Sequence, residues 1–163
     1  MQQRVAAISE KPLVRFFALF HDLGKLATAP ELYPKHHAHD DAGFEMADSF
    51  CNRLCLPVSF RKALAWVSRF HGKANKWEDL LDYTKIKMAE QAIKASIVEI
   101  LPMVSAADKS WNILMSGWDK AIKVAGMNTR ELGIDFDKLE SIPAENRASL
   151  IMQLRVKILQ TIA

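Results

Sequence analysis

Residues 16–25, FFALFHDLGK, carry the pattern on which the interpretation of the whole chain depends. Nearly every residue from Leu13 to Leu19 is apolar, which is typical of a helix buried on most sides. The apolar segment ends in an adjacent imidazole and carboxylate, His21 and Asp22. Burying both groups is costly unless something pairs with them, and a divalent metal ion would do so because both are metal ligands. The alternative is an ordinary helix end with a core histidine that is satisfied by hydrogen bonds.

The other histidines favour the metal site. Residues 34–43, PKHHAHDDAG, place three imidazoles within four residues immediately before an expected helix. A surface loop needs no such concentration, so we expect a functional role for at least one of them. In a chain with only two cysteines, the pattern indicates a site of nitrogen and oxygen ligands rather than a structural zinc finger. All histidines of the chain occur in its first half, at or near expected helix ends: His21, His36, His37, His39 and His71.

Length and composition are those of one ordinary globular domain. The chain has 163 residues, of which 50% are hydrophobic and 25% charged, and we expect a single domain over residues 1–163. No apolar run reaches the roughly 18 residues of a membrane-spanning helix. The N-terminus lacks the pattern of a signal peptide, so we expect a cytoplasmic protein without membrane contact. Cys51 and Cys55 are expected to be reduced packing residues.

Helical spacing recurs along the chain and strand patterns are scarce, so the predicted fold class is all-α. Gly24 is expected to end its helix as a left-handed cap, and Pro102 to kink or divide a helix. Asp40 and Asp41 suit the positive end of a helix. The expected helices cover about residues 2–9, 12–24, 40–54, 59–72, 84–92, 95–108, 111–125 and 143–162, with Ser59 and Thr84 as N-caps and an apolar stripe of the last helix docked on the core.

Four stretches together resemble a known family. They are VRFFALFHDLGK at 14–25, YPKHHAHDDAGFEMADSFCNRLCLP at 33–57, VSRFH at 67–71 and SAADKS at 105–110. In this order they resemble the HD domain, the metal-dependent phosphohydrolase fold. More narrowly, they resemble the C-terminal HD region of bacterial multifunctional CCA-adding tRNA nucleotidyltransferases. The resemblance implies a compact multi-helix fold with the metal site between helices, a motif-bearing core at about 12–110 and C-terminal helices at about 111–163.

The resemblance also implies roles for individual residues. Asp22 is expected to orient or deprotonate a metal-activated water, and Lys25 to reach a phosphate oxygen. The implied cofactor is a divalent ion, with nickel, manganese, cobalt and magnesium left open. The implied metal ligands are His21, Asp22, His39 and Asp108, and His36 and His71 are candidates for the substrate phosphate or a second metal.

The implied reaction is hydrolysis of a phosphomonoester or a cyclic phosphodiester. Substrates of the family members that this sequence resembles include 2′,3′-cyclic nucleotides and 2′-nucleotides, so nucleotides or RNA ends are the expected substrates. No glycine-serine phosphate motif or paired-aspartate strand precedes residue 14, so we do not expect this chain to add CCA to tRNA. The family pattern begins with a histidine that, by spacing, would lie upstream of Met1. Either the chain begins just past that ligand, or the protein lacks it.

Two function classes therefore stay open: a metal-dependent phosphohydrolase, and a catalytically impaired HD domain that binds RNA or protein. Basic residues are frequent between Arg61 and Lys94. They are interpreted either as a footprint for tRNA or another polyanion, or as a solvated helix face. The formal charge of +3 permits an anionic substrate without indicating a nucleic acid. We expect no DNA partner, and the oligomeric state is left open.

Overall fold

The computed structural model describes residues 10–33, 35–109 and 115–162. The regular elements within these ranges are all helical, which confirms the all-α prediction. The helix expected over residues 2–9 lies outside the described residues. No described helix is long and apolar enough to cross a bilayer.

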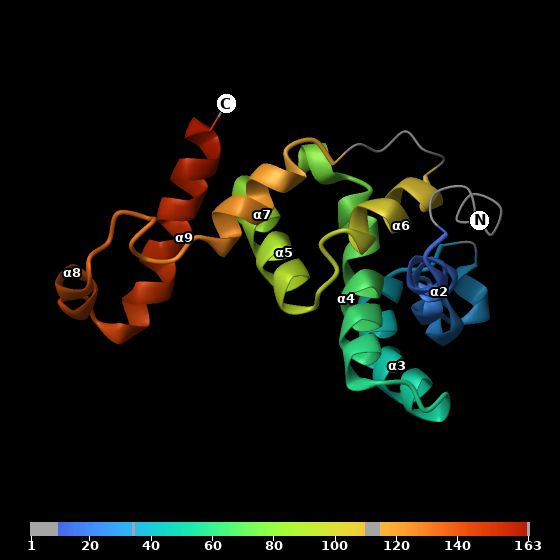
Figure 1. Cartoon of the computed structure of the whole chain (residues 1–163). Coiled ribbons are helices and arrows are strands. Elements are labelled where there is room, and N and C mark those ends of the chain that lie inside the picture. Colours follow the sequence, from blue (N-terminus) through green and yellow to red (C-terminus); the bar gives the residue numbers. More distant parts are fainter. Residues whose placement is uncertain (1–9, 34, 110–114, 163) are drawn as a thin grey trace.

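The long helix α4 (Val58–Ala74) is the centre of the half of the molecule that carries the histidines (Figure 1). Helix α3 (His39–Arg53) packs along it, and α2 (Pro12–Phe20) and α6 (Ile100–Asp108) contact it as well. The short 3-10 helix η1 (Leu23–Ala27) lies against α3. Apolar side chains of these helices form a common core. As a result, the C-terminal ends of α2, α4 and α6 meet the N-terminal end of α3.

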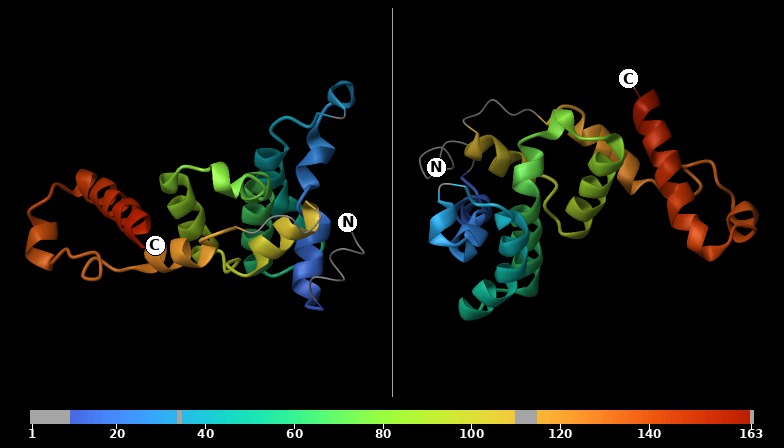
Figure 2. Two further views of the ribbon diagram at one scale, coloured as in Figure 1. Left: turned by 90° about the horizontal axis from the view of Figure 1, so that it is seen from above. Right: turned by 180° about the vertical axis from the view of Figure 1, so that it is seen from behind.

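The remaining helices extend the molecule away from α2 and α3. Helices α5 (Asp82–Lys94) and α7 (Trp118–Gly126) pack together, and α9 (Ala144–Thr161) lies against both. The short helix α8 (Phe136–Glu140) was not predicted from the sequence, and it lies at the far end of the molecule in all three views (Figures 1 and 2).

Two tryptophans pack between the helices that carry the histidines and the group formed by α5, α7 and α9. The rings of Trp77 and Trp118 lie edge to face with their centroids 5.2 Å apart, an arrangement that aromatic pairs favour. Each indole nitrogen is satisfied, because Trp77 Nε1 donates to the Ser116 carbonyl at 2.8 Å and Trp118 Nε1 donates to the Val98 carbonyl at 2.9 Å. Both side chains are buried, so they act as packing residues.

The role of Gly24 differs from the prediction. The sequence predicts a left-handed cap, but α2 ends at Phe20 and Gly24 does not have a positive φ. The glycine is needed instead for close packing. A Cβ atom at this position would lie 1.9 Å from the His39 carbonyl oxygen and 2.4 Å from the Gly43 backbone nitrogen. Because Gly24 has no side chain, η1 can touch the start of α3. This contact brings the carboxylate of Asp22, which precedes η1, close to the imidazole of His39, the first residue of α3.

Two predicted N-caps are also wrong. Helix α4 is preceded by Pro57 and α5 by Leu81, and neither helix has a side-chain hydrogen bond at its N-cap. Ser59 and Thr84 therefore lie inside the first turn. The last residue with extended backbone before each helix is Pro57 (φ −58°, ψ 153°) or Leu81 (φ −64°, ψ 144°). Each helix therefore begins earlier in the chain than the sequence predicts.

The segment expected as one helix over 95–108 is a turn followed by α6. Ser96 has a positive φ of 56°, which ends the preceding helical path. Pro102 lies in the first turn of α6, where its missing N–H removes no helical hydrogen bond and causes no kink. The first part of the helix expected over 111–125, residues 111–114, lies outside the described residues. Of the described part, α7 begins at Trp118, after Gly117 with φ 72°.

Helix α9 docks less deeply than its apolar stripe predicts. None of its side chains is buried, although Leu159 packs against the core. Polar contacts also hold α9 against the rest of the molecule. The Arg155 guanidinium pairs with Glu90 of α5 and donates to the Met127 carbonyl at 2.9 Å.

Candidate metal centre

Three imidazoles are oriented in the same way by the local backbone. Nδ1 of His21, His39 and His71 lies 2.6–2.7 Å from the carbonyl oxygen three residues earlier in the chain. A carbonyl oxygen can only accept, so each Nδ1 carries a proton. In the neutral ring this leaves Nε2 with a free lone pair, and this is the tautomer that a metal-binding histidine needs when its other nitrogen is held by a carbonyl.

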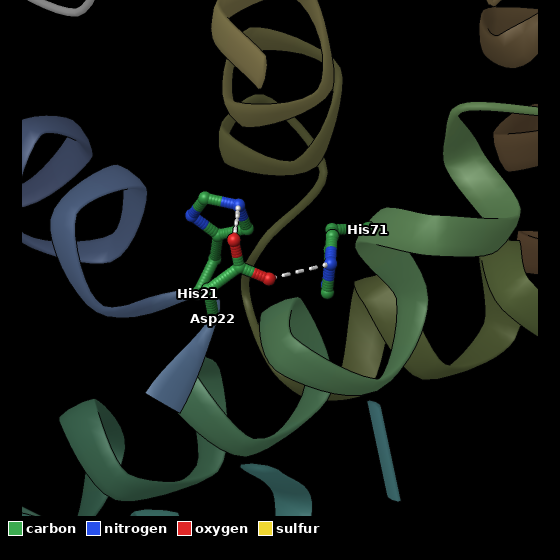
Figure 3. A group of neighbouring side chains, drawn as sticks. All are labelled: His21, Asp22 and His71. Carbon is green, nitrogen blue, oxygen red and sulfur yellow. Dashed lines mark ion pairs between the residues drawn. The ribbon is translucent and has the colours of Figure 1, made fainter. Parts of the chain in front are cut away.

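The Asp22 carboxylate, at the end of α2, lies among these imidazoles. Its Oδ2 is 3.3 Å from His21 Nε2, and its Oδ1 is 3.3 Å from His71 Nε2 and 3.4 Å from His39 Nε2. Figure 3 shows one oxygen directed at His21 and the other at His71. Lys25 donates to Oδ2 at 2.5 Å. One carboxylate thus faces imidazoles that come from the ends of three different helices.

Asp108, at the end of α6, completes this side of the cluster. Its Oδ1 lies 3.7 Å from His21 Nε2. Its Oδ2 accepts a hydrogen bond from Asn75 Nδ2 at 2.6 Å, and Asn75 Oδ1 in turn accepts one from Ser105 Oγ at 2.6 Å. Asn75 therefore fixes the Asp108 carboxylate. Asn75 was not predicted as a site residue from the sequence. The only feature that could have indicated its role is its position four residues after His71.

Asp40 was also missed as a site residue. From the sequence it is expected only to favour a helix N-terminus. In the structure its Oδ1 lies 3.1 Å from His39 Nε2 and 3.5 Å from His71 Nε2. The carboxylate packs on Gly72, where a Cβ atom would lie 2.5 Å from Asp40 Oδ2. The consecutive His-Asp at 39–40, which repeats the pattern at 21–22, is a signal that could have found it.

His36 and His37 lie at or beyond the edge of the cluster. The His36 carbonyl orients His39, and the centroids of the two rings are 6.4 Å apart. His37 is exposed. Of the predicted site residues, the structure brings His21, Asp22, Lys25, His39, His71 and Asp108 together, and His36 only borders them.

The contents of the cluster fit a divalent cation. Among the buried polar atoms without a hydrogen-bond partner are His21 Nε2, Asp22 Oδ1 and Asp40 Oδ1. Lone pairs that face one another need a proton or a cation between them. Two overlapping triads, His21 with Asp22 and His71, and His39 with Asp40 and His71, each have ligand atoms within 4.8 Å of one another. Imidazole and carboxylate without thiolate is a donor set that suits manganese, cobalt, nickel or zinc.

Comparison with known families places these residues within one known domain. The HD domain family matches residues 2–108, which include every residue of the cluster. The chain belongs to the HD domain family. This places it in a superfamily of metal-dependent phosphohydrolases, as the order of motifs indicates.

Curated relatives of this HD domain are multifunctional CCA proteins. One from Legionella pneumophila subsp. pneumophila (strain Philadelphia 1) is 40% identical over 84 residues, which are 52% of this chain and 20% of the relative. One from Teredinibacter turnerae is 38% identical over 85 residues, which are 52% of this chain and 21% of the relative. The chain thus spans about a fifth of the length of these relatives. No solved structure matches it.

The metal-free HD cluster holds opposite charges close together. Burial raises the pKa of the Asp22 carboxyl. Hydrogen bonds from His71 and Lys25 and the charge of His21 lower it by a larger amount, so the pKa lies well below its usual range. The contact with His21 outweighs burial at Asp108 and lowers the pKa of its carboxyl to about 2. Burial lowers the pKa of His71, but Asp22 and Asp40 more than compensate, and it is raised overall. A cation competes with the proton that the raised pKa of His71 favours, so metal affinity should decrease as the pH is lowered.

The cluster opens into a cleft of about 470 Å³. Asp22, His39, Asp40, His71 and Asp108 contribute to its wall. Lysines from separate elements contribute the rest of its charged lining: Lys25, Lys73, Lys76 and Lys109. A metal cluster beside several ammonium groups suits an anionic ligand.

We expect Asn75→Ala to weaken metal binding by about 10- to 100-fold, the usual effect of removing a residue that orients a ligand. The reason is that Asp108 would lose the amide that holds its Oδ2. Calorimetric titration with Mn²⁺ measures the change. The matched control is Asn52→Ala, which removes an exposed amide that contacts Asp48 and Arg61. Equal affinities of the Asn75→Ala variant and the unmodified chain would show that Asn75 does not position a ligand.

Proposed function

We propose that this HD domain is a metal-dependent phosphohydrolase that acts on phosphomonoesters or 2′,3′-cyclic phosphodiesters of nucleotides or RNA ends. The observation that carries the proposal is the convergence of imidazole Nε2 atoms and carboxylate oxygens beside a lysine-lined cleft. The curated relatives are named multifunctional CCA proteins, and the resemblance to CCA-adding tRNA nucleotidyltransferases supports a substrate related to tRNA.

The residues divide the work according to their positions. His21, Asp22 and Asp108 hold the cation, which when bound supplies a nucleophilic water near neutral pH and offsets phosphate charge. Asp22, which its neighbours keep ionised by lowering its pKa, would orient that water, and as an ionised carboxylate it would be able to accept a proton from it. Lys25, whose ammonium group contacts Asp22 Oδ2, would bind a phosphate oxygen as a point charge.

We also propose a second cation position at His39, Asp40 and His71. Asp22 Oδ1 faces His39 and His71 of this triad as well, so it is the shared ligand. Nickel, manganese, cobalt and magnesium are the candidate ions. Elemental analysis of the loaded protein should give close to two ions per chain, and Asp40→Asn should reduce this number toward one.

An impaired HD domain that binds RNA is the alternative function. The observation in its favour is the frequency of basic residues between Arg61 and Lys94, two of which, Lys73 and Lys76, line the cleft. Retention of His21, Asp22, His39 and Asp108 together favours the enzyme, because a degenerate site is expected to lose more than one member.

The test is the initial rate of hydrolysis of 2′,3′-cyclic AMP and 2′-AMP by metal-stripped protein, with each candidate ion added back. We expect no rate without an ion, and turnover with at least one of them. His71→Ala should abolish most of the turnover, since His71 lies in both triads. His37→Ala is the matched control and should keep it, because His37 is exposed outside the cluster. No turnover with any ion, together with RNA binding by metal-free protein, would favour the impaired module.

A further inference from the structure

The lysines of the cleft differ in whether they are already paired. Lys25 forms an ion pair with Asp22. Lys73, Lys76 and Lys109 line the same cleft, and within the described ranges none of the three has an ion pair or a side-chain hydrogen bond. They come from the last turn of α4, the turn that follows it and the residue after α6. Three separate backbone segments thus present uncompensated ammonium groups to one volume.

The two arginines of the 61–94 stretch are already paired, and Lys62 and Lys94 line a different cavity. Arg61 pairs with Asp48 and Arg69 pairs with Asp41, both at 3.0 Å. The basic stretch therefore reaches the cleft only through Lys73 and Lys76. This argues against a diffuse polyanion footprint along the stretch, and for a local site beside the metal cluster.

The number of cations exceeds what one phosphate needs. The reacting phosphate would be neutralised by the metal and Lys25, and the acidic side chains of the cluster are occupied by the histidines and the metal. Lys73, Lys76 and Lys109 are exposed and line the same cleft, so three further cationic side chains stay available to a second anion. A volume of about 470 Å³ is within the range of pockets that hold small ligands. A second anionic group of the ligand fits these observations.

We propose that Lys73, Lys76 and Lys109 form a second anion subsite, which binds a phosphate other than the one being hydrolysed. The proposal rests on the proposed function for the place of the reacting phosphate. The second phosphate is either the 5′-phosphate of the same nucleotide or the internal phosphodiester of an oligonucleotide. In both cases the site selects ligands with two phosphates over ligands with one.

Equilibrium binding tests the subsite without depending on turnover. The ligands are adenosine 2′-monophosphate, adenosine 2′,5′-bisphosphate and the dinucleotide ApA with a terminal 2′-phosphate, titrated calorimetrically into metal-free and manganese-loaded protein. We expect at least one of the two-phosphate ligands to bind about tenfold more tightly, which corresponds to about 1.4 kcal/mol, because each exposed ion pair contributes only modestly to binding. The preference should shrink as salt is raised. Whichever of the two binds more tightly identifies the source of the second phosphate.

Variants separate the subsite from general charge effects. The triple variant Lys73→Gln, Lys76→Gln, Lys109→Gln should lose the preference while binding the monophosphate nearly as before. The corresponding triple arginine variant should retain it. Lys62→Gln is the matched control, since Lys62 is an exposed lysine of α4 that lines a different cavity. Equal binding of all ligands by the unmodified chain, or a preference that survives the glutamine variant, would overturn the proposal. Loss of turnover alone would count against the proposed function, because the binding preference is measured separately.

Discussion

Asp22→Ala should remove metal from the protein and lower the rate of phosphate-ester hydrolysis by more than about 100-fold. Removal of a residue that merely orients a ligand already costs about 10- to 100-fold in metal affinity or activity, and Asp22 itself faces His21, His39 and His71. The helical fold should persist, since the Asp22 side chain is 27% exposed and does not belong to the apolar core. Elemental analysis after dialysis, circular dichroism and the hydrolysis assay measure the three effects.

The matched control is Asp41→Ala, which removes a neighbouring carboxylate that is exposed and paired with Arg69 outside the cluster. It should retain both metal and activity. Loss of folding in Asp22→Ala without loss of metal binding would contradict the assignment, because the residue would then be structural. Retention of full metal content with normal folding would contradict it too.

Gly24→Ala should destabilise the protein by about 3 kcal/mol, the upper part of the usual range for over-packing. The added methyl group would meet the His39 carbonyl oxygen at 1.9 Å and the Gly43 nitrogen at 2.4 Å. Both are backbone atoms of one helix, so relief requires α3 to move as a whole. For a chain of this size the melting temperature should fall by roughly 6–12 °C. Metal affinity should fall as well, because the shift separates His39 from Asp22.

Gly126→Ala is the control for this change. A Cβ atom at Gly126 would contact only Ile93 Cδ1, at 3.9 Å, and the residue ends α7 without a positive φ. Alanine favours helical backbone over glycine by roughly 0.5–1 kcal/mol, so the melting temperature should stay the same or rise slightly. A Gly24→Ala variant as stable as the unmodified chain would show that η1 and α3 are less tightly apposed than the structure indicates.

The sequence predicted those parts of the site that are encoded locally. His21 and Asp22 adjoin an apolar helix, and the distance between this pair and the histidines at 36–39 is short, so the pattern is visible without a structure. The order of motifs then placed Asp108 with them. Asp40 and Asn75 could not be found in this way, since their roles arise only when α3 packs on α4 and α4 ends beside α6.

Glycine and proline show a second limit of sequence reasoning. A glycine after a helix predicts a left-handed cap, but Gly24 is required for a close approach of two backbones, and both uses look the same in sequence. Pro102 similarly signals either a kink or the first turn of a helix. The choice depends on Ser96, whose positive φ ends the preceding helix and is not evident from residue type.

The most direct test of the account is a titration of metal-free protein with Zn²⁺ at pH 8, followed by the nitrogen chemical shifts of the histidine rings. Before the addition, His21, His39 and His71 should each carry a protonated Nδ1, as their carbonyl contacts require. On addition of zinc, their Nε2 resonances should shift at a low molar ratio of metal, whereas those of the exposed His37 should not. Unchanged Nε2 resonances of His21, His39 and His71 at saturating zinc would contradict the claim that these imidazoles form the metal centre.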